Sequence, residues 1–121
     1  MRVLENCEPK QVFYYFEEIC KIPHGSRNTK QISDYLVAFA KEHGFDYVQD
    51  EMNNVIIYKP ATPGYENAPT VILQGHMDMV CEKRPDVQHD FEKDGLNLSV
   101  KDGYVTANGT TLGGLSLIHI S

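Results

Sequence analysis

The first third of the chain carries apolar residues at helical spacing. Between Pro9 and Lys21 they form a single stripe: Val12, Phe13, Phe16, Ile19 and Cys20. Pro9 suits the first helical position, because its missing N–H would have no partner there. Pro23 should end the helix, since the residue before a proline is pushed out of the α region.

A second helix is predicted from a polar loop onward. Asn28 is a plausible cap, and the helical pattern runs to about His43. Gly44 is well placed to close the helix in a left-handed conformation. Four residues should face inward: Ile32, Tyr35, Leu36 and Phe39.

Strand patterns follow the helices. Apolar and polar residues alternate in residues 45–49, and residues 54–58 form a run rich in β-branched residues. Both patterns predict strands. Residues 70–74, an apolar run between Pro69 and Gly75, predict a buried strand. Residues 96–107 alternate around Lys101-Asp102-Gly103, which predicts a hairpin. The order of elements predicts one α/β layer rather than two domains.

Composition and charge narrow the possible partners. The chain has 121 residues, 41% hydrophobic and 23% charged, and its net charge is -6. This negative charge does not favour binding to nucleic acid or to an anionic membrane surface. The charged start does not look like a secretory leader, and the longest apolar run, residues 36–40, is too short to span a bilayer. Three cysteines without CxxC spacing indicate free thiols, so we expect a cytoplasmic protein.

The candidate chemistry lies directly after the predicted strand at residues 70–74. His76 and Asp78 should sit at the carboxyl end of that strand, where ligands bind in open α/β sheets. A neutral histidine can bind a metal, and a nearby carboxylate can orient a ligand or a catalytic group. Taken alone, this His-x-Asp pattern is more often a hydrogen-bonded strand end.

Other polar residues have simpler interpretations. We expect His24 to be a solvated loop histidine, and the doublet Glu17-Glu18 to lie on a solvated helix face. His89-Asp90 should also be solvated, and Cys81 should be a small buried apolar residue rather than a metal ligand. His119, near the C-terminus, has no expected role.

Residues 1–113 resemble the N-terminal quarter of the bacterial aminoacyl-histidine dipeptidases, cytosolic enzymes of the zinc aminopeptidase and aminoacylase superfamily. The resemblance rests on ordered stretches: Phe16-Glu-Glu-Ile-Cys-Lys-Ile-Pro-His-Gly-Ser26, Ile32-Ser-Asp-Tyr-Leu36, Asn53-Asn-Val-Ile-Ile57, Lys59-Pro-Ala-Thr-Pro-Gly64, Gln74-Gly-His-Met-Asp-Met-Val-Cys-Glu-Lys83 and Gly109-Thr-Thr-Leu-Gly113.

The resemblance implies the N-terminal part of a mixed-sheet α/β catalytic domain that holds two zinc ions and is interrupted by a lid and dimerisation domain. His76 matches a zinc ligand, and Asp78 matches the carboxylate that orients it. The implied substrates are dipeptides with a free N-terminus, including those that end in histidine. The implied full-length enzyme is a homodimer, and a glutamate takes the proton from a zinc-bound water.

The chain departs from the family pattern after Gly113. The aspartate that bridges both metals should follow, but Gly114 and Leu115 stand there. We therefore interpret residues 114–121 as a non-native tail, from a frameshift or sequencing-adapter read-through, and expect the chain as written to be an inactive fragment. Two alternatives stay open: a small non-catalytic α/β binding module with a natural C-terminal strand, and a fragment of a related tripeptidase or deacylase.

Overall fold

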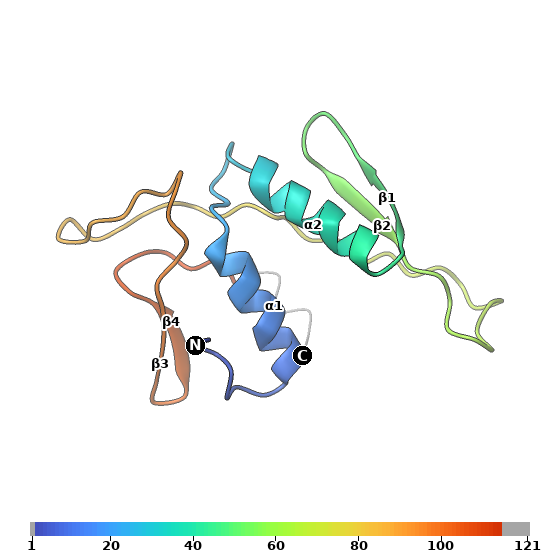
Figure 1. Cartoon of the computed structure of the whole chain (residues 1–121), viewed down its shortest axis with the longest axis horizontal. Coiled ribbons are helices and arrows are strands. Elements are labelled where there is room, and N and C mark those ends of the chain that lie inside the picture. The colour runs from blue at the N-terminus through green and yellow to red at the C-terminus, as the bar shows by residue number, and fades with distance from the viewer. Residues whose placement is uncertain (1, 115–121) are drawn as a thin grey trace.

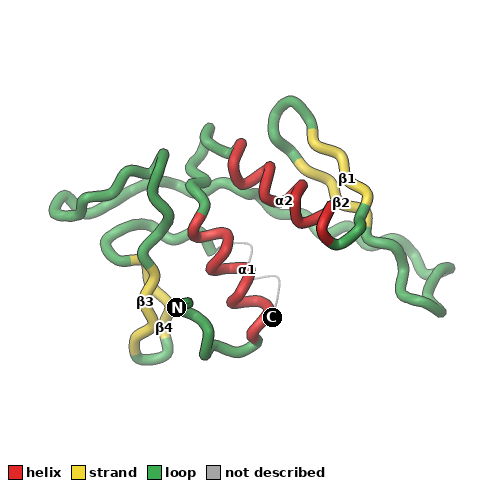
Figure 2. The backbone as a smooth tube through the Cα atoms, viewed as in Figure 1, coloured by secondary structure: helices red, strands yellow, loops and turns green. Residues whose placement is uncertain are grey.

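The computed structural model describes residues 2–114 and contains helices and short strands joined by long loops (Figures 1 and 2). The α/β class is confirmed. Of the predicted tail at residues 114–121, only Gly114 is described, and residues 115–121, including His119, lie outside the described residues. The elements in chain order are α1 (Lys10–Lys21), α2 (Lys30–Glu42), β1 (Asp46–Gln49), β2 (Val55–Tyr58), β3 (Leu98–Lys101) and β4 (Tyr104–Ala107).

Both predicted helices are present, but their first residues differ from the prediction. Pro9 is the N-cap of α1 rather than its first helical residue, because its backbone is extended, with ψ at 134°. The N-cap of α2 is Thr29 and not Asn28. The N–H of Asn28 donates to Gly25 O at 2.8 Å, which holds Asn28 in the preceding turn. Gly44 has φ of 70° and confirms the left-handed close of α2.

Two hairpins account for the four strands. β1 pairs antiparallel with β2, and β3 pairs antiparallel with β4. Asp102 and Gly103 connect β3 to β4 with φ values of 53° and 80°. Positive φ at both central residues matches the twist of a tight hairpin, which explains the Asp-Gly sequence.

The predicted strand at residues 70–74 is wrong. Val71, Ile72 and Leu73 are 79%, 85% and 93% exposed, and no strand within residues 2–114 pairs with them. The strands also do not join into one sheet, because each hairpin forms its own two-stranded sheet. An apolar, β-branched run becomes a strand only where a neighbour accepts its backbone hydrogen bonds. Residues 70–74 have no such neighbour within residues 2–114, because β1 pairs only with β2 and β3 only with β4.

The main buried cluster lies between the N-terminal segment, α1 and the second hairpin. Leu4, Phe16 and Cys20 are its buried members. Burial, and then the charge of Glu17, raises the pKa of the Cys20 thiol to about 12. Half-buried residues complete the cluster: Cys7, Phe13, Leu96, Leu98, Val105 and Leu112. Neither helix of residues 2–114 is long and apolar enough to cross a bilayer.

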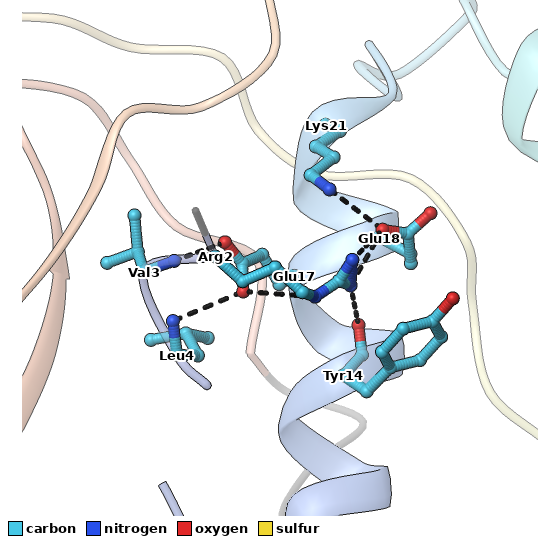
Figure 3. Close-up of polar contacts among 7 residues, drawn as sticks. All are labelled: Arg2, Val3, Leu4, Tyr14, Glu17, Glu18 and Lys21. Atoms are coloured by element: carbon cyan, nitrogen blue, oxygen red, sulfur yellow. Dashed lines mark hydrogen bonds and ion pairs between the residues drawn. The ribbon is translucent and has the colours of Figure 1, made fainter. Parts of the chain in front are cut away.

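Glu17 ties the N-terminal segment to α1 (Figure 3). The solvated face predicted for it is wrong, because Glu17 is 5% exposed. Its Oε1 accepts the N–H of Val3 at 2.7 Å, and its Oε2 accepts the N–H of Leu4 at 3.2 Å. Arg2 Nε lies 3.8 Å from the same Oε2. A buried carboxylate is tolerated here because both oxygens have donors.

Glu18 makes a more exposed set of contacts beside Glu17. It accepts hydrogen bonds from Arg2 at 2.7 Å and from Lys21 at 2.8 Å. The Arg2 guanidinium also lies 4.0 Å from the centre of the Tyr14 ring. Lys21 first, and Arg2 after it, lower the pKa of Glu18.

Replacing Glu17 should therefore destabilise the fold more than replacing Glu18. In Glu17→Gln the amide NH2 must face the N–H of Val3, which is partly buried, or that of Leu4, which is buried, and that donor then loses its partner. We expect a loss of about 1.5–3 kcal/mol in the free energy of unfolding, measured in urea. The matched control Glu18→Gln should lose less than about 1 kcal/mol, because its partners are partly solvated. Equal losses would contradict the anchoring role of Glu17.

The exposed run at Val71–Leu73 should promote self-association. An extended apolar segment with free backbone groups is a template for pairing with another chain. We expect Ile72→Lys to shift the sedimentation profile toward monomer and to reduce binding of an apolar dye. Gln74→Lys, at an exposed position of the same segment, adds the same charge without removing apolar surface. If Gln74→Lys has an equal effect, charge rather than the apolar run controls association.

Candidate functional site

His76 and Asp78 face each other at the end of the exposed segment. His76 Nδ1 lies 3.0 Å from Asp78 Oδ1. An ionised carboxylate can only accept, so this contact places the imidazole proton on Nδ1. The lone pair then lies on Nε2, the nitrogen that remains for another partner. The His76 side chain is 49% exposed, so Nε2 can be reached from solvent.

Ser26 holds the other oxygen of the same carboxylate. Its Oγ donates to Asp78 Oδ2 at 2.6 Å. The Ser26 hydroxyl first, and the His76 ring after it, lower the pKa of Asp78. Ser26 was not predicted as a site residue, because 52 positions separate it from Asp78 and no motif spacing connects them.

The loop between α1 and α2 brings Ser26 to the site. Met79 N donates to His24 O at 2.9 Å, and Ser26 N donates to Met79 O at 3.1 Å. These two bonds form a short parallel bridge between Gly25 and Met79. The prediction of a solvated His24 is wrong, because His24 is 6% exposed and its Nδ1 lies 2.7 Å from Ile22 O.

Small residues allow the bridge to form. A Cβ at position 25 would lie 2.6 Å from Cys81 Sγ, and a Cβ at position 113 would lie 3.2 Å from Met79 Cβ. Cys81 is half-buried, and burial raises the pKa of its thiol. It therefore packs against the loop instead of presenting a reactive thiolate.

A cavity of about 470 Å³ lies beside the pair. Its lining comes from residues of α1 and α2 and from residues 76–78, together with His24, Gly113 and Gly114. The helical lining residues are Gln11, Val12, Tyr15, Phe16, Ile19, Ile32 and Leu36. The lining is thus mostly apolar, and its polar side chains include His76 and Asp78 as well as Gln11 and Tyr15 of α1.

The donor set fits part of a metal site. A histidine whose Nδ1 is bonded to a carboxylate and whose Nε2 is accessible is the usual arrangement for one zinc ligand. Residues 2–114 contain no group of three His, Cys, Asp or Glu side chains that could hold a metal ion. The roles of His76 as ligand and Asp78 as orienting residue therefore stay predictions.

Comparisons with known proteins identify the relatives. The chain is 43% identical over 113 residues to the cytosol non-specific dipeptidase of Escherichia coli (strain K12). It also matches the crystal structure of aminoacylhistidine dipeptidase from Vibrio alginolyticus, with a TM-score of 0.88 and 43% identity. The resemblance to the aminoacyl-histidine dipeptidases is confirmed. No family model matches the chain.

The matched regions show how much of the relatives this chain represents. The Escherichia coli match covers 93% of this chain and 23% of that protein, and the Vibrio match covers 92% and 23%. The chain therefore spans about a quarter of the length of these dipeptidases, as expected for a fragment. The relatives are hydrolases by name, so the alternative of a small non-catalytic binding module is not favoured.

The close approach of Gly25 to Cys81 gives a test of the loop geometry. Gly25→Ala should destabilise the chain by about 1–3 kcal/mol, because the added methyl overlaps the thiol. The double variant Gly25→Ala/Cys81→Ala removes Sγ and should recover most of that loss, measured by urea unfolding. An equal loss in both variants would show that the contact with Cys81 is not the cause.

Proposed function

We propose that this chain supplies His76 as one metal ligand, and Asp78 as its orienting carboxylate, to the site of a zinc-dependent dipeptidase. The observation that carries the proposal is the His76–Asp78 contact of 3.0 Å in a chain 43% identical to a dipeptidase. Dipeptides with a free N-terminus, including those that end in histidine, are the proposed substrates. The proposed full-length protein is a cytoplasmic homodimer.

The residues of this chain have distinct tasks in that site. Asp78 accepts a hydrogen bond from the Nδ1–H of His76. This bond fixes the tautomer that leaves Nε2 as the ligand atom. Two bound zinc ions would polarise the scissile carbonyl and activate a water molecule. Catalytic zinc uses three protein ligands, so we place the other ligands and the general base in the part of the relatives' length that this chain does not span.

A chimera tests this function directly. The matched segment of the Escherichia coli dipeptidase is replaced by residues 1–113 of this chain, and hydrolysis of dipeptides is measured with zinc present. We expect the chimera to cleave Xaa-His dipeptides and His76→Ala to abolish cleavage, because one zinc ligand is lost. The 121-residue chain alone should show no hydrolysis under the same conditions.

Two controls make the result specific. His89→Ala removes another histidine of the same chain, from a loop with no role in the proposed site, and should retain cleavage. N-acyl amino acids and tripeptides are assayed in parallel with dipeptides. A folded chimera that cleaves only those substrates would favour the deacylase or tripeptidase alternative. Cleavage of dipeptides that persists in His76→Ala would contradict the role of His76.

A further inference from the structure

We propose that Ser26 is a positioning residue, whose hydroxyl holds the Asp78 carboxylate in the orientation that makes His76 present Nε2. This inference rests on the proposed function, because it concerns the same site. It adds a residue from a different element, the loop between α1 and α2, to the residues of the His-x-Asp motif.

The geometry of the Asp78 carboxylate supports this role. The torsion that turns an aspartate carboxylate is broad, so one hydrogen bond at Oδ1 leaves the group free to rotate. Ser26 Oγ at 2.6 Å from Oδ2 fixes the second oxygen. With both oxygens held, the carboxylate plane is set, and Oδ1 points at His76 Nδ1, 3.0 Å away.

Residues 70–78 have little other support. They form neither helix nor strand and, within residues 2–114, pair with no strand. The bridge to Met79 begins only one residue after Asp78 and involves backbone atoms. The Ser26 hydroxyl is thus the contact through which the bridge positions the Asp78 side chain.

The position of Ser26 does not depend on its side chain. Its N–H donates to Met79 O at 3.1 Å, and the Asn28 N–H donates to Gly25 O at 2.8 Å. The side chain itself is exposed. The alternative partner of Oγ, Met79 O, lies 3.5 Å away, at the limit of a hydrogen bond. Removing the hydroxyl should therefore free Asp78 without disturbing the loop.

The experiment compares the tautomer of His76 in the 121-residue chain and its variants. Ring 15N NMR at about pH 8, above the ordinary histidine pKa of about 6.5, reports which nitrogen carries the proton. The His76 signals are assigned with His76→Gln. We expect the Nδ1–H form to dominate in the parent chain and in Ser26→Thr, which keeps the hydroxyl. Ser26→Ala should give a mixture of both tautomers.

Two further variants separate positioning from a general structural effect. Asp78→Ala should give the same tautomer mixture as Ser26→Ala, and the double variant should add nothing, because both act through one contact. The amide signals of His24, Ser26 and Met79 show whether the bridge persists. An unchanged tautomer in Ser26→Ala with the bridge intact would overturn the inference, and so would a tautomer mixture in Ser26→Thr with the bridge intact.

The chimera extends the test to function. Ser26→Ala in the chimera should weaken zinc binding about 10–100-fold, the usual effect of removing a group that orients a ligand. Ser26→Thr should restore the affinity. The NMR result does not depend on hydrolysis, so a chimera that fails to cleave dipeptides would contradict the proposed function and leave the role of Ser26 to be decided by the tautomer.

Discussion

The short bridge between the α1–α2 loop and Met79 is the constraint on which the site depends. Its two backbone hydrogen bonds, Met79 N to His24 O and Ser26 N to Met79 O, attach an otherwise exposed segment to the helices. The segment before Met79 has no ladder partner within residues 2–114. The position of His76 is therefore set by a loop between two helices and not by a sheet, contrary to what the apolar run before it predicts.

Elements whose conformation is determined by residues close in the sequence were predicted well. The stripe of α1 and the left-handed Gly44 at the end of α2 follow from local preferences. The turn at Asp102-Gly103 is fixed by the φ values that only a few residues adopt readily. The strand expected at residues 70–74 needed a distant partner, and the pattern of one segment cannot reveal whether a partner exists.

The same limit explains why the burial of two polar residues was not predicted. Glu17 lies on a helix beside Glu18, and no local pattern distinguishes the two. Glu17 is buried because the backbone of Val3 and Leu4 reaches both of its oxygens. His24 is buried because Met79 pairs with its loop. In each case the sequence predicted a solvated residue, because the segment that covers it comes from another part of the chain.

The candidate site combines both kinds of information. The His-x-Asp spacing pointed to the two residues, because a carboxylate two positions from a histidine can meet its ring. The spacing could not show which atom of each meets the other, and that choice decides the chemistry. A carboxylate that accepts from Ser26 at one oxygen and from His76 at the other has no proton to donate, so the ring proton must stay on Nδ1. Ser26, 52 positions away from Asp78, holds the second oxygen of the same carboxylate. A motif search confined to the His-x-Asp spacing would find His76 and Asp78 and miss Ser26.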